Sequence, residues 1–423
     1  MIEIQRIKEN KSEVIVGLNK RGIHCEKEID NILEIDQDWR NAKTELQEVS
    51  TKINAISKDI GRLFSTGDKE QAQSLKTQSV DLKKEEASLK AKVEDLQSKL
   101  SGAIMSLPNI PRPEVPAGKD EKDNEIVFES GEGPKKEDVM LPHWDLANKY
   151  NLIDFELGVK VTGSGFPFYR GQGARLQRAL ISFFLDEASK AGYEEFSSPL
   201  MVNEESGVGT GQLPDKEGMM YHVGTENLYL IPTAEVPLTN MYRNTILPNA
   251  DFSIKITGHT PCFRREAGSY GKDVRGLNRL HQFEKVEIVR IETPDNAESA
   301  LQEMITHVKG LLEKLGLQYR ILKLCAGDTG FASAITYDFE VYSAGQDKWL
   351  EVSSVSRFDT FQSNRLKLRY KDENNKSRLC HTLNGSALAL PRIMAALLEN
   401  HQTEGGINMP EVLIPYTGFN VIS

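Results

Sequence analysis

The feature that most constrains the fold is an unbroken series of apolar residues, spaced three and four apart, that runs from Ile32 to Leu63. Its members are Ile32, Ile35, Trp39, Ala42, Leu46, Val49, Ile53, Ile56, Ile60 and Leu63. A seam of this kind, sustained over several heptads, predicts a coiled coil rather than an ordinary surface helix. At the rise of an α-helix the segment would extend about 48 Å, which is longer than a compact domain needs, so we expect it to project.

A second helix follows after a short break. Residues Ser65–Asp68 read as a helix stop and a new N-cap. Because the connection is short, the two helices must be antiparallel neighbours, and we predict a helical hairpin. Acidic and basic side chains on its outer positions nearly balance, so charge alone does not separate a nucleic-acid-binding arm from a dimerisation device or a spacer. The second helix repeats leucine every seven residues, with further apolar residues interleaved: Leu75, Leu82, Leu89 and Leu96, with Val93 and Leu100.

A proline-rich segment separates this hairpin from the rest of the chain. Proline recurs at Pro108, Pro111, Pro113 and Pro116. Proline at this density cannot continue a helix and predicts an extended, charged linker. We therefore predict an N-terminal helical-hairpin domain over residues 1–107, a linker over 108–125 and a second domain over 126–423.

The second domain mixes helices and strands in an order that favours an α+β fold. The strand-like runs are grouped and do not alternate strictly with helices, which predicts an antiparallel sheet flanked by helices. Helical spacing covers residues 172–191, 296–315 and 388–400. Strand-like runs cover 193–199, 227–231, 252–257, 282–291, 319–323, 334–341 and 349–356.

Glycines at positions 207, 209 and 211 superficially resemble a phosphate-binding loop. We see no strand leading into them, and the Gln212–Pro214 segment that follows cannot open a helix. The pattern therefore favours a mobile surface loop over a nucleotide fingerprint.

Composition limits the class of protein. The formal charge is −10, from 52 Lys and Arg against 62 Asp and Glu, which argues against a protein that coats nucleic acid through bulk positive charge, although a localised basic site stays open. The four cysteines, Cys25, Cys262, Cys325 and Cys380, are far apart, which favours reduced thiols and argues against structural zinc. Neither a bilayer-spanning apolar run nor a signal-peptide core is apparent, so we expect a cytoplasmic protein without membrane contact.

The clearest chemical signal is a cation and an anion two residues apart, Arg264 and Glu266, at an expected strand end. Residues i and i+2 of a strand point to one face, so both side chains would share one site. A guanidinium beside a carboxylate suits a ligand that is anionic in one part and carries an amine in another. The pair alone could equally be a surface salt bridge, worth about 0–1 kcal/mol.

The surrounding segments decide between these interpretations. Residues Thr260–Leu277 and Leu280–Glu287 resemble motif 2 of the class II aminoacyl-tRNA synthetases, in the form carried by seryl-tRNA synthetases of bacterial type. The order of the motifs along the whole chain is similar to that family. The other segments that carry the resemblance are the triplet Thr233-Ala234-Glu235, residues 351–354 with Arg357 and Phe361–Arg365, the motif 3 stretch Thr382–Arg392, and the motif 1 helix 172–191 ending at Pro199.

The resemblance implies a role for each matching residue in ATP binding. Arg264 would bind the α-phosphate and the serine carboxylate end, and Arg392 would bind the γ-phosphate, so that Arg264, Glu266 and Arg392 are the expected catalytic residues. Glu351 and Ser354 would help to hold Mg²⁺. The expected ATP-binding residues are Arg264, Arg265, Glu266 on the adenine side, Phe283 stacked on adenine, Glu351, Val352, Ser353, Ser354 and Arg392.

A second set of residues would surround serine. Glu235 is the preferred partner of the serine ammonium and Glu287 of its hydroxyl, although the reverse assignment stays open. The expected serine-binding residues are Thr233, Ala234, Glu235, Arg264, Glu287, Thr382, Asn384 and Ser386.

The implied activity is formation of seryl-adenylate from serine and ATP, followed by transfer of the seryl group to the 3′-terminal adenosine of tRNA(Ser), and of tRNA(Sec) where present. The resemblance also implies a homodimer and tRNA contacts through the coiled coil and the motif 2 loop. Two other classes stay open. A paralogue that activates an amino acid for a carrier protein or another acceptor is disfavoured by the retained hairpin, and a non-catalytic binding protein by the retention of Arg264, Glu266 and Arg392.

Overall fold

The computed structural model describes residues 1–131, 140–215, 218–249, 252–266 and 275–423. These residues form two compact units. One comprises Met1–Asn19 and Ile23–Pro108, and the other comprises Lys20–Gly22 and Asn109–Ser423.

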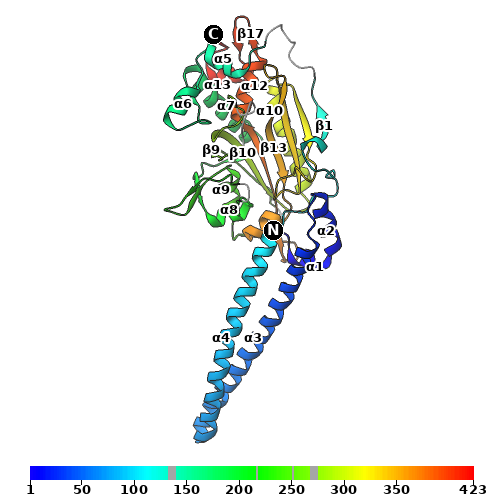
Figure 1. Ribbon diagram of the computed structural model, residues 1–423, viewed down its shortest axis with the longest axis vertical. Helices are drawn as coiled ribbons and strands as arrows, with labels where there is room; N and C mark the ends of the chain where they lie inside the picture. Colours follow the sequence, from blue (N-terminus) through cyan, green and yellow to red (C-terminus); the bar gives the residue numbers. More distant parts are fainter. Residues whose placement is uncertain (132–139, 216–217, 250–251, 267–274) are drawn as a thin grey trace. The chain divides into compact units, whose positions relative to one another are not determined.

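The first unit is a long antiparallel helical hairpin with two short helices at its N-terminus. Helices α3 (Glu26–Thr66) and α4 (Lys69–Met105) run beside each other, as Figure 1 shows. They are preceded by α1 (Ile4–Glu9) and α2 (Lys11–Lys20). Gly67 ends α3 in the left-handed conformation at φ +86°, and the Asp68 side chain accepts the backbone N–H of Gln71 at 3.2 Å to begin α4. The predicted hairpin, with its stop and its new N-cap, is confirmed.

Apolar side chains of the predicted seam hold the hairpin together. Ile32, Ala42, Val49 and Ile53 of α3 are buried. One polar pair crosses between the helices, because Ser50 Oγ donates to Glu86 at 2.6 Å. The heptad pattern thus describes the contacts of the hairpin, since apolar positions on one stripe face the partner helix.

The second unit is built on an eight-stranded sheet with the strand order β1-β11-β12-β13-β16-β10-β9-β4. Among the described residues every neighbouring pair is antiparallel except β4 with β9. The expected antiparallel sheet is therefore confirmed. Its strands are β1 (Glu125–Glu129), β4 (Glu194–Glu195), β9 (Ile254–Phe263), β10 (Gln282–Glu292), β11 (Tyr319–Lys323), β12 (Ile335–Ser343), β13 (Lys348–Arg357) and β16 (His381–Ala389).

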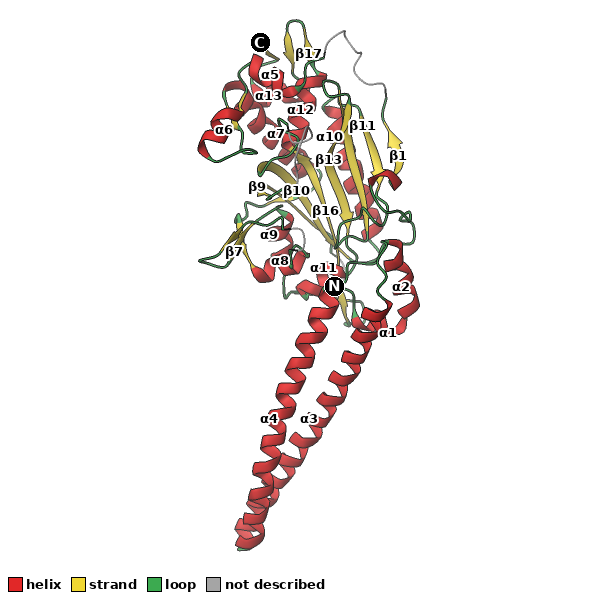
Figure 2. Cartoon of the chain, viewed as in Figure 1, coloured by secondary structure: helices red, strands yellow, loops and turns green. Residues whose placement is uncertain are grey.

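Three helices pack against this sheet: α7 (Gly171–Lys190), α10 (Ala297–Lys314) and α12 (Leu390–Asn400), as Figure 2 shows. Strand alternation separates core from site. Val286 and Ile288 of β10 join the core with these helices, whereas Lys285 and Glu287 point to the opposite face. The same strand therefore contributes both to stability and to a polar surface.

Smaller elements surround the sheet. They are α5 (His143–Lys149), α6 (Phe155–Val161), α8 (Glu204–Thr210), α9 (Glu235–Asn240), α11 (Phe361–Leu366) and α13 (Ile414–Thr417), the 3₁₀ turns Glu121–Asp123 and Glu411–Leu413, and the short strands β2 (Ile153–Asp154), β3 (Phe168–Tyr169), β5 (Met201–Asn203), β6 (His222–Val223), β7 (Leu228–Leu230), β8 (Ile246–Leu247), β14 (Arg369–Lys371), β15 (Ser377–Leu379), β17 (Gln402–Thr403), β18 (Gly406–Asn408) and β19 (Val421–Ile422).

The glycine-rich segment differs from its prediction as a mobile surface loop. It forms the end of α8, and strand β5 leads into it. The Asn203 side chain accepts the Ser206 N–H at 3.0 Å as an N-cap, and Gly211 ends the helix at φ +91°. Gly207 and Gly209 are buried because Leu213 and Leu366 pack where their side chains would stand. Tertiary packing therefore overrides the local preference of glycine for loops.

The proline-rich segment is extended but packed. The backbone N–H of Asn109 donates to the Phe331 carbonyl at 2.9 Å, and its side-chain amide donates to the Phe358 carbonyl at 2.8 Å. Arg112 donates its backbone N–H to Ala334 at 2.9 Å. Residues from Asn109 onward thus belong to the second unit, and the limits of the three predicted segments stay a prediction.

The state of the cysteines and the character of the helices bear on two expectations from composition. Cys25, Cys262, Cys325 and Cys380 are free and buried. Within the described ranges, no helix has the length and apolar character that a membrane span requires.

Candidate active site

Three neighbouring strands, β10, β16 and β13, carry most of the predicted site residues. Thr382, Asn384 and Ser386 alternate along β16 and so share one face, while Leu383 and Ala387 enter the core. On β10, Glu287 lies opposite Ser386 in the ladder. The site is therefore assembled on the sheet face that lies away from the main hydrophobic core.

A buried polar network joins β10 to the loop before α9. Thr233 Oγ1 donates to Glu287 Oε2 at 2.8 Å, and Asn384 Nδ2 donates to Glu287 Oε1 at 3.1 Å. Lys285 forms an ion pair with Glu287 and donates to Thr233 Oγ1 at 2.9 Å. The Glu287 carboxylate is fully buried, so these donors replace the water that it loses.

Glu235 forms the second acidic group of this pocket. Gln362 Nε2 donates to Glu235 Oε1 at 2.6 Å, and Gln362 Oε1 in turn accepts the Thr382 hydroxyl at 2.7 Å. Burial, and then the charge of Glu287, raise the pKa of Glu235 to about 7. The Gln362 hydrogen bond and the charges of Lys285 and Arg264 oppose this rise. Two carboxylates with different surroundings thus line one small polar pocket.

Arg264 lies just beyond β9, at the edge of this pocket. Its backbone N–H donates to the His281 carbonyl at 2.9 Å, and its guanidinium lies 5.3 Å from the centre of the Phe283 ring. Glu235 is within electrostatic reach of this region, because the charge of Arg264 lowers the pKa of Glu235. Arg264 and Phe283 therefore line a surface that continues from the pocket.

Arg264 and Glu266 do not share a face by strand alternation, which corrects the expectation from their spacing. Strand β9 ends at Phe263, and Glu266 is left-handed at φ +47°. The Glu266 carboxylate accepts a hydrogen bond from Arg279 at 3.1 Å, and the side chain of Arg265 is exposed. Residues 267–274 of the motif 2 segment lie outside the described residues.

Strand β13 carries the expected nucleotide and metal residues. Ser354 Oγ donates to Asp338 Oδ1 at 2.5 Å and lies 3.5 Å from Glu351 Oε1. Burial, and then the charge of Glu351, hold the pKa of Asp338 well above its usual range. Ser353 Oγ donates to the Ser386 carbonyl at 2.6 Å, which ties β13 to β16, and Val352 is buried in the core.

Arg392 enters helix α12 beside this strand. Its Nη1 donates to the Glu351 carbonyl at 2.7 Å and lies 3.4 Å from the Glu351 carboxylate, and its Nε donates to the Asn278 carbonyl at 3.1 Å. The guanidinium is therefore held between β13 and the segment that follows motif 2.

Sequence reasoning assigned no role to three residues of this site: Lys285, Gln362 and Asp338. Lys285 stands two residues before Glu287 on β10, a spacing that strand periodicity would have placed on the same face. Gln362 lies inside the Phe361–Arg365 segment that carries the resemblance, and Asp338 pairs with Ser354 in the β12–β13 ladder. Gln362 and Asp338 have partners that are distant in sequence, Glu235 and Ser354, so no local pattern reveals these two residues.

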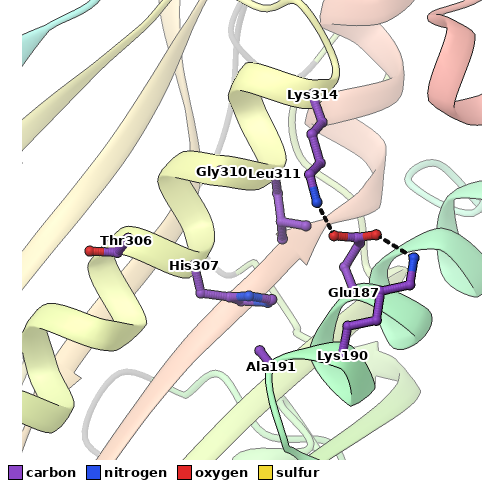
Figure 3. Close-up of a pocket in the computed structure, with 8 residues that line it drawn as sticks. All are labelled: Glu187, Lys190, Ala191, Thr306, His307, Gly310, Leu311 and Lys314. Atoms are coloured by element: carbon purple, nitrogen blue, oxygen red, sulfur yellow. Dashed lines mark hydrogen bonds and ion pairs between the residues drawn. The ribbon is translucent and has the colours of Figure 1, made fainter.

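A cavity of about 270 Å³ lies elsewhere in the second unit, between α7 and α10 (Figure 3). Its two lysines, Lys190 and Lys314, both pair with Glu187. None of the predicted site residues lines it, so the polar face of the sheet remains the candidate active site. The cavity is lined by Glu187, Lys190, Ala191, Thr306, His307, Gly310, Leu311 and Lys314.

Comparison with known proteins agrees with this geometry. Residues 1–111 match the seryl-tRNA synthetase N-terminal domain, and residues 221–401 match the tRNA synthetase class II core domain (G, H, P, S and T). The serine–tRNA ligase of Salinibacter ruber is 50% identical over 421 residues, covering 99% of this chain and 98% of that protein. The serine–tRNA ligase of Akkermansia muciniphila is 45% identical over 424 residues, covering 100% of this chain and 99% of that protein.

Solved structures show the same relationship. The seryl-tRNA synthetase of Pyrococcus horikoshii, complexed with ATP, has a TM-score of 0.92 at 36% identity and covers 100% of this chain and 99% of that one. The cytoplasmic serine–tRNA ligase of Naegleria fowleri, in complex with AMP, has a TM-score of 0.87 at 26% identity, with coverage of 100% and 99%. The chain therefore belongs to the seryl-tRNA synthetase family and is a class II serine–tRNA ligase.

Proposed function

We propose that the pocket around Glu235 and Glu287 binds the serine that this ligase activates, and that ATP lies along Arg264, Phe283, Glu351 and Arg392. The observation that carries the proposal is the buried network in which Thr233, Lys285 and Asn384 converge on Glu287. A small pocket with two carboxylates suits a ligand with an ammonium group and a hydroxyl. Ala234, Thr382 and Ser386 complete its wall.

The reaction requires no side-chain nucleophile, because the serine carboxylate is itself the nucleophile. The serine carboxylate attacks the α-phosphorus of ATP in line, the bond to the β-phosphate oxygen breaks, and seryl-adenylate and pyrophosphate result. Catalysis then rests on positioning and on cations that stabilise phosphate charge. Arg264 at the pocket edge and Arg392 beside β13 are placed at the two ends of the surface that we assign to ATP, and Arg265 and Glu266 lie beside Arg264. The 3′-terminal hydroxyl of the tRNA then attacks the adenylate, and AMP leaves.

Glu351 and Ser354 are suited to hold Mg²⁺. Their oxygens lie 3.5 Å apart, and Asp338 accepts a hydrogen bond from Ser354. Mg²⁺ prefers oxygen ligands and is commonly held by one or two carboxylates together with substrate phosphates. When bound, the ion would neutralise phosphate charge, while the backbone of Val352 and Ser353 would line the nucleotide.

Selection of serine follows from the polarity of the pocket. A site that pairs a substrate hydroxyl rejects an analogue without it by roughly 10⁴–10⁵, because its buried groups would be left unpaired. Glu287 is fully buried and is the group that we assign to the serine hydroxyl, with Glu235 near the ammonium. Alanine and glycine should therefore be excluded by unpaired polar groups, and threonine by the closeness of the walls.

The helical hairpin is the part of the chain that we assign to tRNA(Ser) binding, together with the motif 2 loop, and tRNA(Sec) is a further substrate where it is present. The match of residues 1–111 to the seryl-tRNA synthetase N-terminal domain supports this assignment. The hairpin offers exposed lysines along both helices despite the acidic total of the chain. We assign the protein to the cytoplasm, where charged tRNA is used.

A homodimer is the proposed assembly. Apolar side chains are exposed next to α7, the helix that resembles motif 1: Val159 and Val161 of α6 are 58% and 62% exposed, and Phe168 of β3 is 40% exposed. Exposed apolar surface is a common feature of protein interfaces. Sedimentation of the purified protein tests this assembly, and a monomer at micromolar concentration would refute it.

The decisive experiment is ATP–pyrophosphate exchange across the standard amino acids. We expect serine to give by far the fastest exchange. Absence of exchange with serine would refute the assigned chemistry and favour a non-catalytic binding protein. Rapid exchange without charging of tRNA(Ser) would instead favour a paralogue with another acceptor.

A further inference from the structure

A second buried polar network lies behind Arg392, on residues that neither the sequence motifs nor the proposed reaction uses. Its centre is the pair His143 and Glu399, both of which are fully buried. His143 is the first residue of α5. Glu399 lies in the last turn of α12, the helix whose first turn contains Arg392. A buried carboxylate lowers the stability of the fold unless hydrogen-bond donors surround it.

The Glu399 carboxylate is surrounded by donors. The backbone N–H and Nδ1 of His143 lie 2.8 Å and 2.7 Å from Oε1, and Gln346 Nε2 donates to the same oxygen at 3.0 Å. Ser343 Oγ and the Gly345 N–H donate to Oε2. Burial opposes ionisation, but the hydrogen bonds from His143 and Ser343 hold the pKa of Glu399 below its ordinary value. Both oxygens of the buried Glu399 carboxylate therefore have hydrogen-bond donors.

The two nitrogens of His143 have different partners. The backbone N–H of Leu277 donates to Nε2 at 2.8 Å, so the ring proton must lie on Nδ1, where it is donated to Glu399. Gly276, at φ +68°, leaves room for this contact, because a β-carbon there would stand 2.2 Å from Nε2. The imidazole thus fixes the backbone of residues 276–277, within the segment that resembles motif 2.

The network continues from this backbone to Arg392. Gln346, which donates to Glu399, accepts the side-chain amide of Asn278 at 2.8 Å. The backbone carbonyl of Asn278 accepts Arg392 Nε at 3.1 Å. Asn278 is thus held on both sides, through Leu277 by His143 and through its own amide by Gln346. Its carbonyl, together with the Glu351 carbonyl on β13, holds the guanidinium of Arg392 in place.

We propose that His143 and Glu399 are positioning residues for ATP, acting through the segment Gly276–Asn278 to fix Arg392. The inference rests on the proposed function, in which Arg392 binds the triphosphate. The effects on ATP binding and on serine binding can be separated, because serine is assigned to a different part of the site, around Glu235 and Glu287. Loss of the network should therefore weaken ATP binding without weakening serine binding.

Two substitutions of His143 dissect the network. His143→Asn keeps a donor near Nδ1 but loses the acceptor for Leu277, and His143→Gln keeps an acceptor near Nε2 but loses the donor to Glu399. We expect His143→Asn to raise the KM for ATP in pyrophosphate exchange about tenfold, with the KM for serine within about twofold, and His143→Gln to have a smaller effect. His401→Asn is the matched control, since His401 follows α12 and its imidazole Nε2 lies 3.1 Å from the Leu315 carbonyl, outside the network around Glu399.

The proposal is overturned if folded His143→Asn leaves both KM values unchanged, or raises them together as general damage would. If that variant does not fold, Gln346→Leu decides the question, because Gln346 is only partly buried. An unchanged ATP dissociation constant for Gln346→Leu, measured by calorimetry, would then overturn the proposal. Calorimetry also separates the two hypotheses: a wild-type protein that binds ATP but does not exchange with serine refutes the proposed function, while the variants still decide the role of His143. A wild type that binds no ATP refutes both.

Discussion

Gln362 Nε2 donates to Glu235 Oε1 at 2.6 Å, and both side chains are buried in the pocket that we assign to serine. The hydrogen bond stabilises the ionised form of Glu235 against burial and the charge of Glu287, which together raise its pKa to about 7. One amide thus contributes directly to the ionisation of this carboxylate.

Serine affinity should depend on pH near neutrality. A raised carboxyl pKa means that Glu235 is protonated below about pH 7 and carries its charge above it. Because the serine ammonium needs the charged form, the dissociation constant should fall about tenfold between about pH 6 and pH 8. Calorimetric titration with serine at several pH values measures this, and a flat profile would contradict the assignment of Glu235.

Gln362→Leu should move this transition to higher pH. The substitution removes the hydrogen bond that lowers the pKa of Glu235, so the carboxylate would ionise later. Gln318→Leu serves as the control, because Gln318 donates at the protein surface to the Gly131 carbonyl at 3.2 Å. Identical pH profiles for the Gln362 variant and the wild type would show that the amide does not set this ionisation.

Lys285→Met should destabilise the protein by about 3–5 kcal/mol, because it leaves the buried Glu287 carboxylate without its cation. Urea unfolding measures the change in the free energy of unfolding. Adding Glu287→Gln should recover part of the loss, since the unpaired charge is then removed. A single variant within about 1 kcal/mol of the wild type would mean that the ion pair carries little net stability.

Arg264→Ala should lower the rate of ATP–pyrophosphate exchange by at least about two orders of magnitude, since the guanidinium would stabilise charge on the reacting phosphate. Arg320→Ala provides a comparison, because Arg320 pairs with Glu340 and lies over Trp349, and neither of these is a predicted site residue. Near-normal exchange by the Arg264 variant would remove this residue from the catalytic group.

Deletion of roughly residues 41–91 should spare adenylate formation and abolish charging of tRNA(Ser). The segment lies wholly within α3 and α4, and the second unit has its own core. Pyrophosphate exchange and aminoacylation of the same preparation measure the two activities. Equal charging by the shortened and full-length proteins would refute the tRNA-binding role of the hairpin.

Features set by local sequence were predictable, and features set by distant pairs were not. The hairpin follows from apolar residues three and four apart, with Gly67 and Asp68 at its turn. Strand β16 was not predicted from the sequence, although the segment Thr382–Arg392 was recognised. The strand depends on pairing with β10 and β13, which its own residues do not reveal. The contacts of Glu287 with Thr233 and Asn384 span 54 and 97 residues, so only the fold brings them together.

The resemblance brought the correct segments into one site but did not describe how they support one another. The glycines of α8 show the physical reason. Their local preference is for a loop, yet Gly209 is helical and buried because Leu366 and Asn240 occupy the space of a side chain. Similarly, the spacing of Arg264 and Glu266 predicted a shared strand face, but β9 ends at Phe263, before either residue.

Strand β16 lies between β10 and β13, which carry the residues assigned to serine and to the triphosphate respectively. Adjacent strands are about 4.8 Å apart, so the two outer strands are separated by roughly 10 Å, a spacing fixed by backbone hydrogen bonds and not by any side chain. The sheet therefore fixes the distance between the residues assigned to the amino acid and those assigned to the nucleotide. Substitutions in the pocket can alter which amino acid binds. They leave the distance between β10 and β13 unchanged.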